Sequence, residues 1–160
     1  MRSVKGVQTP HGRHGRVTKA LSKLDSNRDV AGPIIVFDAL CVLCSANAQF
    51  VLQHDRERRF RLASMQGPVG AAVFRAHGIE PDNPDTIIVV DGDRVWRDSD
   101  AVLTIYAGCG WPWRAVSVFK IVPRVVRDFI YRWVARNRYR LFGRRETCWV
   151  PSVADKDRVV

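Results

Sequence analysis

The chain has 160 residues and a mass of 18.2 kDa, with 46% hydrophobic and 26% charged residues, which is typical of one folded domain and not of a wholly disordered protein. No uncharged apolar run approaches the ~20 residues of a membrane-spanning helix, which excludes an integral membrane protein. The net charge of +10 is uneven, with +5 over residues 1–33, −3 over residues 34–109 and +8 over residues 110–148. A nucleic-acid binder would concentrate its basic residues on the folded domain, so this acidic middle is not typical of one.

Residues 1–33 predict a disordered basic arm. Their basic side chains are scattered among Gly, Ser and Thr, and Val and Leu are too sparse to form a buried face. The segment lacks the apolar stretch of a secretory signal, so we expect a cytoplasmic protein in a reducing compartment.

The folded part is expected to start at Ile34. The run Ile34-Ile35-Val36-Phe37 is typical of a strand buried on both faces of a sheet. A helical stripe then runs from Cys44 to about Arg56, and a short second strand covers residues 60–63. Gly67-Pro68 opens a second helix, which Gly78 is expected to end.

A hairpin follows in the second half of the predicted domain. Residues 86–90 form another fully apolar strand, Asp91-Gly92-Asp93 is a tight-turn signal, and residues 94–97 alternate as the return strand. Ser99-Asp100 is expected to cap a third helix, through Tyr106. This order of strands and helices predicts an α/β thioredoxin-like fold (β-α-β-α-β-β-α) over residues 34–109.

Residues 110–150 predict a basic, amphipathic helical extension, and residues 151–160 a tail. Six apolar residues recur at helical spacing after Pro123, and we expect them to pack on the core with the arginines outside. These are Val125, Val126, Phe129, Ile130, Trp133 and Val134. The alternative is an extension that binds an anionic membrane surface or nucleic acid.

Cys41-Val42-Leu43-Cys44 concentrates the chemistry of the chain. Between a buried strand and a helix, this spacing places the first thiol at the helix N-terminus, where free N–H groups and the helix dipole favour a thiolate. Cys44 lies one turn further, close enough to bridge. The pattern predicts that Cys41 attacks a disulfide and that Cys44 resolves the mixed disulfide.

Two alternatives apply to these cysteines. A zinc site normally brings its ligands as two close pairs, whereas Cys109 and Cys148 stand alone, so we expect no metal and no other cofactor. The two thiols could also be small buried hydrophobic groups that happen to lie three residues apart.

Asp38 ends the first strand, three residues before Cys41. A carboxylate at the end of an apolar strand is costly unless it has a partner or a role. Asp38 either exchanges a proton with Cys44 during resolution or fixes the loop and caps the helix, and both roles stay open at this point.

Asp38-x-x-Cys41-x-x-Cys44 after the Ile-Val-Phe strand resembles the opening motif of the DCC family of thiol-disulfide oxidoreductases (DUF393, YuxK-like proteins). The similarity covers about residues 34–151 and continues through Asp91-Gly92, the segment Ala135-Arg136-Asn137-Arg138-Tyr139, and Glu146-x-Cys148. Ala39 departs from the glycine usual in the family. The resemblance implies a thioredoxin-like fold and redox chemistry at the two cysteines, and it names neither substrate nor partner.

Further residues are candidate accessories of the site. Pro84 precedes an apolar strand, where thioredoxin-like proteins often have a cis-proline, although a trans turn proline is the commoner case. Cys148 matches the closing cysteine of the family and either approaches the redox pair or is a packed free thiol. Arg136, Asn137 and Arg138, with Tyr139, either fix the extension onto the acidic middle or form an anion site beside the cysteines.

These observations predict a thiol-disulfide oxidoreductase that exchanges electrons with a disulfide-containing protein or a small thiol. Its disulfide would be reduced by an external reductant. The alternative is a non-enzymatic interaction module that binds an anionic membrane surface or nucleic acid through the basic extension. We expect no specific nucleic-acid partner and at most a weak contact with an anionic membrane surface.

Overall fold

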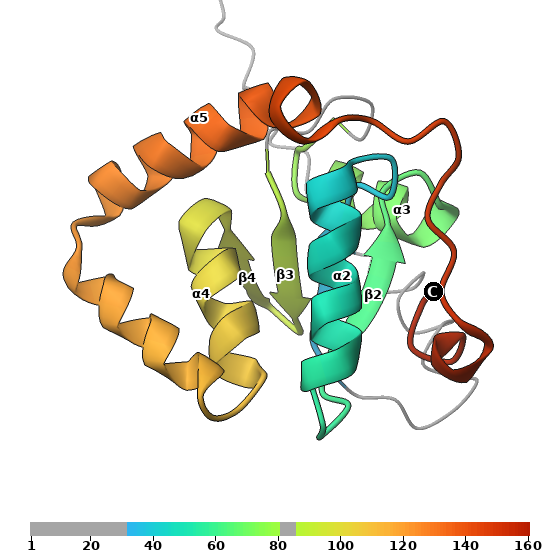
Figure 1. Cartoon of the computed structure of the whole chain (residues 1–160), viewed down its shortest axis with the longest axis horizontal. Helices are drawn as coiled ribbons and strands as arrows, with labels where there is room; N and C mark the ends of the chain where they lie inside the picture. Colours follow the sequence, from blue (N-terminus) through green and yellow to red (C-terminus); the bar gives the residue numbers. More distant parts are fainter. Residues whose placement is uncertain (1–31, 81–85) are drawn as a thin grey trace, which may run out of the picture. The chain divides into compact units, whose positions relative to one another are not determined.

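A computed structural model describes residues 32–80 and 86–160 of the chain. Its centre is a four-stranded sheet with the strand order β2-β1-β3-β4 (Figure 1). β1 pairs with β2 in parallel, whereas β3 is antiparallel to both β1 and β4. The strands are β1 (Ile34–Phe37), β2 (Arg61–Ser64), β3 (Ile88–Asp91) and β4 (Arg94–Arg97).

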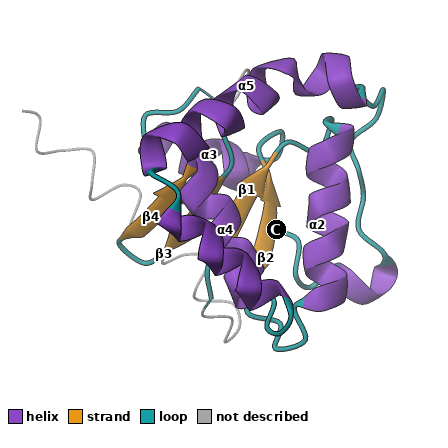
Figure 2. Ribbon diagram, turned by 60° about the vertical axis from the view of Figure 1, so that its left-hand side comes forward, coloured by secondary structure: helices purple, strands orange, loops and turns teal. Residues whose placement is uncertain are grey.

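Helices cover both faces of this sheet (Figure 2). α2 and α4 contribute to one apolar cluster with Ile35, Phe37 and Val89, while α3 contributes to a second cluster with Val36 and Ile88. The order of elements confirms the predicted thioredoxin-like fold. The helices are α2 (Val42–His54), α3 (Pro68–Ala76), α4 (Asp98–Gly108), the 3-10 helix η1 (Trp113–Ile121), α5 (Arg124–Phe142) and the 3-10 turn η2 (Val153–Asp155).

The β1 strand lies where the unbroken apolar run predicts it. Successive side chains of a strand point to opposite faces, so a strand with helices on both sides needs apolar residues at every position. Ile35 and Phe37 face the α2 side and Val36 faces the α3 side, all three almost fully buried. The hairpin prediction is also confirmed, because the turn between β3 and β4 contains Gly92 in the left-handed conformation, with φ of 55°.

The expected cap of α4 was wrong. The helix begins at Asp98 with Arg97 at its N-cap, so Ser99 and Asp100 lie within its first turn. Their side chains are directed to α5 instead, where Ser99 Oγ donates to Asp128 and Asp100 accepts a hydrogen bond of 2.9 Å from Arg127. Contacts with another helix therefore take the place of a local cap.

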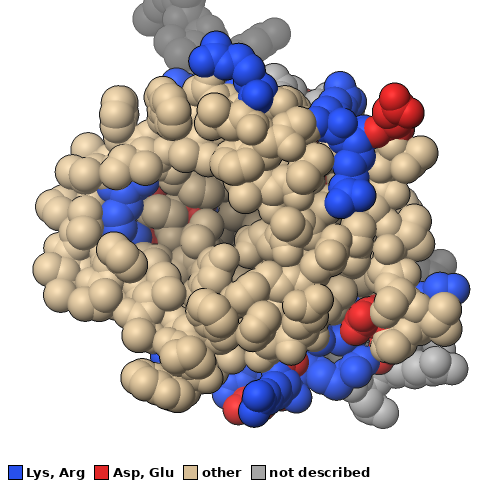
Figure 3. Space-filling view, in the orientation of Figure 1, with Lys and Arg blue, Asp and Glu red and all other residues tan. Residues whose placement is uncertain are grey.

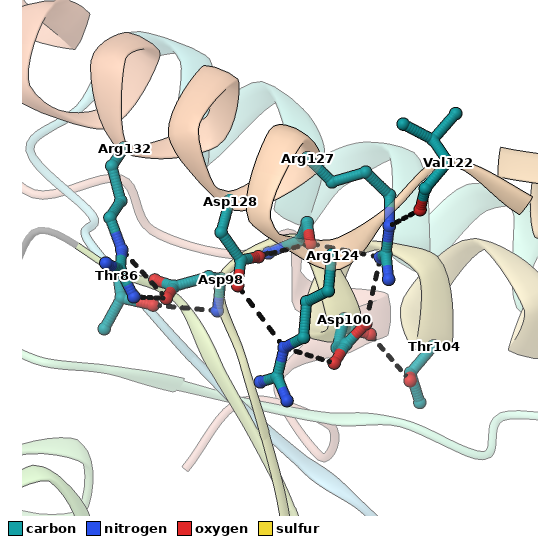
Figure 4. A network of polar contacts seen from close by, with 10 residues as sticks. Thr86, Asp98, Asp100, Thr104, Val122, Arg124, Arg127, Asp128 and Arg132 are labelled. Carbon is teal, nitrogen blue, oxygen red and sulfur yellow. Dashed lines mark hydrogen bonds and ion pairs between the residues drawn. The ribbon is translucent and has the colours of Figure 1, made fainter. Parts of the chain in front are cut away.

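The side of α5 that meets the rest of the protein is polar. Arg132 pairs with Asp98 at 2.8 Å and Arg127 pairs with Asp100, which joins the first half of α5 to the start of α4 (Figure 4). The Tyr131 hydroxyl accepts a hydrogen bond of 2.8 Å from the N–H of Ile87, beside β3.

The expected packing of the apolar residues of α5 on the core was wrong. Val125 is 82% exposed and Phe129 is 73% exposed, and Val126, Ile130 and Trp133 are exposed as well. Only Val134, of the six residues in that prediction, is partly buried. The helix is amphipathic as expected, but its polar side is bound by Asp98 and Asp100 of α4 and by Asp38, directly after β1, so the apolar side faces outward.

The last residues of the chain lie along β2. Val159 forms a parallel bridge with Leu62, whose N–H and carbonyl bond to Arg158 and Val160. Arg158 also forms a buried pair with Asp55, at 2.5 Å, at the end of α2. This segment therefore covers the edge of β2, a pairing that no pattern in the sequence predicts.

Candidate redox site

Cys41 and Cys44 lie at the start of α2. Cys41 is the N-cap residue in an extended conformation, and its Sγ accepts a hydrogen bond of 3.2 Å from the N–H of Cys44. A sulfur atom therefore takes the place of the Ser, Thr or Asp oxygen that usually caps a helix. The unpaired N–H groups and the positive end of the helix dipole both favour a negative charge on that sulfur.

The two thiols differ in acidity. The hydrogen bond donated by the Cys44 thiol has the largest influence and lowers the pKa of Cys41 to about 7. Burial opposes this effect, while the N–H of Cys44 and the charge of Arg138 reinforce it. The pKa of Cys44 is raised, because its proton is held by Cys41, because it is buried and because a neighbouring thiolate disfavours a second charge. A thiolate at Cys41 beside a protonated Cys44 is therefore the favoured reduced state.

Access to the two sulfurs is unequal. Cys41 is 0% exposed, whereas Cys44 is partly exposed. The segment of residues 143–149, here called the strap, covers the loop before α2. Its N–H groups at Arg145 and Trp149 donate to the carbonyls of Leu40 and Ala39, at 2.7 and 3.1 Å, and Arg144 forms a bridge with Cys41.

A cavity of about 470 Å³ opens beside Cys44. Its wall is mostly apolar and is formed by α2, α4 and α5 together with the ends of β1 and β3, a location and size typical of small-molecule sites. Asp38 and Arg138 supply charged groups at one end. The other lining residues include Phe37, Leu43, Asn47, Phe50, Ile87, Val102, Tyr106, Tyr131 and Val134.

Asp38 is buried at the end of β1 and is surrounded by donors. The Tyr139 hydroxyl and the Arg138 guanidinium donate to one carboxylate oxygen, and the Leu40 N–H and the Gln66 side-chain amide donate to the other. Burial alone would raise the pKa of Asp38, but these four donors hold it below its ordinary value. Such a carboxylate accepts a proton poorly at neutral pH, which favours the loop-fixing role over the proton-exchanging role.

Arg138 and Tyr139 bring the end of α5 to the redox pair. Arg138 Nη2 lies 3.2 Å from Asp38, and both side chains are under 10% exposed. The Arg138 guanidinium also lies 4.8 Å from the centre of the Tyr139 ring. Two roles were left open for this segment, attachment to the acidic middle and an anion site. Arg138 and Tyr139 lie beside Asp38 and fix α5 to the loop before Cys41, which corresponds to the first role.

The other predicted accessories lie elsewhere or outside the described residues. Arg136 is exposed, and the amide of Asn137 donates within the helix to the carbonyl of Trp133. Cys148 is an exposed free thiol in the strap. Pro84 lies outside the described residues.

Gln66 is a site residue that the sequence analysis missed. Its side chain donates to Asp38 at 2.7 Å and accepts from the N–H of Ala39 at 3.1 Å, so it links the turn after β2 to the loop before Cys41. No motif contains it, since its role depends on the parallel pairing of β1 with β2. Over residues 32–80 and 86–160, no three His, Cys, Asp or Glu side chains are grouped so as to hold a metal ion.

Comparison with protein families gives a match over residues 35–144 to the model of the DCC1-like thiol-disulfide oxidoreductases. Among curated proteins, the chain is 29% identical over 133 residues to the uncharacterized protein YuxK of Bacillus subtilis, covering 83% of this chain and 97% of that protein. It is 38% identical over 117 residues to the DCC family protein At1g52590, chloroplastic, of Arabidopsis thaliana, covering 72% of this chain and 68% of that protein. No solved structure gave a significant match.

Proposed function

The chain belongs to the DCC1-like thiol-disulfide oxidoreductase family, and from that premise we propose that Cys41 and Cys44 are its redox centre, which reduces a disulfide in a protein or a small molecule. The observation that carries this proposal is the hydrogen-bonded pair at the start of α2, with the pKa of Cys41 lowered to about 7. A thiolate with a pKa close to the ambient pH combines abundance with nucleophilicity.

The reaction proceeds in two displacements. The Cys41 thiolate attacks one sulfur of the substrate disulfide, a Cys41–substrate bond forms, and the other substrate sulfur leaves as a thiolate that takes up a proton. Cys44 then loses its proton and attacks Cys41 Sγ, which releases the second substrate thiol and leaves a Cys41–Cys44 disulfide. Two electrons have passed to the substrate, and an external thiol reductant, of the kind that a reducing cytoplasm holds, restores the dithiol.

The acidity of Cys44 changes in a way that suits its role in the second displacement. In the reduced protein its proton bonds to Cys41, which stabilises the attacking thiolate. Once Cys41 is in the mixed disulfide, that negative charge is gone. The hydrogen bond that holds the Cys44 proton and the repulsion by a neighbouring thiolate, two causes of the raised pKa of Cys44, disappear with it. The nucleophile is therefore activated at the step that needs it.

Asp38 and Arg138 act as positioning residues in this scheme. Asp38 holds the loop through Leu40 and Gln66, and it anchors Arg138, whose positive charge favours the Cys41 thiolate. The cavity beside Cys44 offers an apolar site for the substrate group that flanks the disulfide.

The burial of Cys41 adds one requirement, which is movement of the strap. A fully buried sulfur cannot meet a substrate disulfide, so the strap must release Leu40 and Ala39 before the first displacement. Arg145→Pro removes the N–H that donates to Leu40 and is expected to increase the alkylation rate of Cys41 severalfold. Arg145→Ala keeps that N–H and serves as the matched control. Equal alkylation rates in the two variants would contradict the requirement.

Trapping of mixed disulfides tests the function itself. Cys44→Ser removes the resolving thiol, so it is expected to accumulate adducts at Cys41 when the protein is offered disulfide substrates, whereas Cys41→Ser is expected to form none. Cys148→Ser, which removes an exposed thiol of the strap, controls for adventitious adducts. Adducts at Cys44 in the Cys41→Ser variant would reverse the order of the two cysteines, and disulfide reduction that survives loss of both would overturn the proposal.

A further inference from the structure

The outward side of η1 and α5 is an apolar surface, here called the outer face. Its α5 part consists of Val125, Val126, Phe129, Ile130 and Trp133, and its η1 part consists of Val118, Phe119 and Ile121, all of them exposed. Exposed groups of large apolar residues on this scale mark contact sites with proteins or membranes in folded domains. In Figure 3 the left-hand region, where η1 and the first half of α5 lie, shows charged atoms mainly inside a hollow and not on its outer rim.

Ion pairs fix the orientation of α5 with this side outward. Arg127, Arg132 and Arg138 on the inner side bind Asp100, Asp98 and Asp38, which belong to α4 and to the end of β1. Rotation of the helix to bury its apolar residues would break all three pairs and place arginines in contact with the apolar core. The fold therefore maintains the outer face as a surface.

The charged residues on the outer face indicate which class of partner it binds. Asp128 is the only acidic residue between positions 110 and 145, and it lies on the inner side, bound to Ser99 and Arg124. The outward side of α5 continues past Trp133 with Arg136 and Arg140, both exposed. The outer face thus combines apolar and aromatic side chains with basic ones, and no carboxylate lies on it.

We propose that the outer face of η1 and α5 docks onto the surface of an anionic lipid bilayer. Amphipathic helices with Trp, Phe and Ile on one side and arginine around them lie in the plane of the interface, with the apolar residues among the acyl chains and the basic residues at the headgroups. Trp133 stands at the border between the apolar and basic turns, where the amphipathic indole ring is favoured. In the described part of the chain no helix is long and apolar enough to cross a bilayer, so docking is confined to the surface.

A second copy of the chain fits the outer face less well than a bilayer does. The outward side of α5 carries Arg136 and Arg140 and no carboxylate, so two copies would bring like charges together, whereas anionic headgroups neutralise them. Docking in this way would hold the redox site at the membrane surface, and it is independent of the thiol chemistry.

Vesicle sedimentation tests the proposal with the full chain. The protein is mixed with phosphatidylcholine vesicles that contain or lack phosphatidylglycerol, at low and at physiological salt. We expect binding to the anionic vesicles, weakened by salt, and a loss of at least about tenfold in binding in the variant Phe129→Glu/Trp133→Glu. The variant Arg136→Gln/Arg140→Gln is expected to lose binding to anionic vesicles by about tenfold while keeping any binding to neutral ones.

A matched variant and a redox assay separate the outcomes. Val150→Glu/Val153→Glu places the same charges at exposed apolar positions outside the outer face and is expected to bind as the wild type does. All three variants are expected to keep their disulfide exchange. Failure of the intact chain to bind anionic vesicles, or equal binding by Phe129→Glu/Trp133→Glu, would overturn the proposal. A dimer in solution that this variant dissociates would assign the face to a second copy and would overturn it as well.

Discussion

The inner and outer sides of α5 differ in polarity and in the contacts that they make. The inner side is polar and carries Arg138 and Tyr139 to the buried Asp38, three residues from the redox pair. The outer side is apolar and touches little, with Phe129 exposed in the middle of the helix. Amphipathicity therefore identifies which residues share a face of a helix, while the partners available in the rest of the fold decide which face is buried.

The largest expected effect belongs to the inner side. Arg138→Leu removes one partner of a buried ion pair and leaves the Asp38 carboxylate uncompensated, which is expected to lower the free energy of unfolding by about 3–5 kcal/mol. Urea denaturation measures this. Arg158→Leu, at the buried pair with Asp55 at the opposite end of α2 from Cys41, is the matched variant and is expected to cost a similar amount. A loss under about 1 kcal/mol in Arg138→Leu would show that the ion pair on the inner side of α5 does not stabilise the fold.

Tyr139→Phe deletes one hydrogen bond to the same carboxylate. Hydrogen bonds to charged groups contribute about 1.5–3 kcal/mol, and we expect a loss of stability in that range. Tyr106→Phe is the control, since its hydroxyl donates to the neutral side chain of Asn47 at 3.2 Å, where a loss of about 1 kcal/mol is expected. Equal losses in the two variants would argue against a charged Asp38.

The two buried arginines are expected to differ in their effect on Cys41. Arg138 lowers the pKa of Cys41, so Arg138→Leu is expected to raise this pKa. Asp38 acts in the opposite direction, and Asp38→Asn is therefore expected to lower it. Arg158→Leu should leave the pKa unchanged. Thiolate absorbance against pH measures all three, and a shift of the same sign in Arg138→Leu and Asp38→Asn would show a general loosening of the loop.

The smallest effects are expected on the outer side. Phe129→Ala and Trp133→Ala remove large side chains that are more than half exposed, and each is expected to change the free energy of unfolding by about 0.5 kcal/mol or less. Phe74→Ala, in the buried cluster between α3 and the sheet, is the control, with an expected loss of about 3–5 kcal/mol. A loss above about 2 kcal/mol at Phe129 would show that α5 buries its apolar side in solution.

The sequence predicts well where one local pattern decides the structure. The apolar run of β1, the Asp91-Gly92 turn and the Cys-x-x-Cys pair before a helix are of this kind, because strand burial, turn conformation and helix capping depend on neighbouring residues. These local patterns are sufficient to predict the fold class and the position of the redox pair.

What the sequence could not predict are polar contacts between distant segments. Attachment of the Arg138 segment to the acidic middle was one of two alternatives, but its pairing with Asp38, across 100 residues, was not predicted. Arg158 meets Asp55 across 103 residues, and Gln66 reaches the loop before Cys41 only because β1 and β2 are paired. The orientation of α5 depends on these contacts, so apolar periodicity alone assigned the wrong side of the helix to the core. The family motif Glu146-x-Cys148 marks the strap in the sequence, but nothing in the sequence predicts that this segment covers Cys41.

The central claim, that Cys41 is the thiolate of a redox pair, is tested most directly by thiolate absorbance of the reduced protein against pH. The account predicts a rise with its midpoint near pH 7 that disappears in Cys41→Ser and persists in Cys109→Ser, the control at a buried thiol of the core whose own pKa is raised to about 11. A midpoint at or above the ~8.5 of a free cysteine, or a rise near pH 7 that survives Cys41→Ser and disappears in Cys44→Ser, would contradict it.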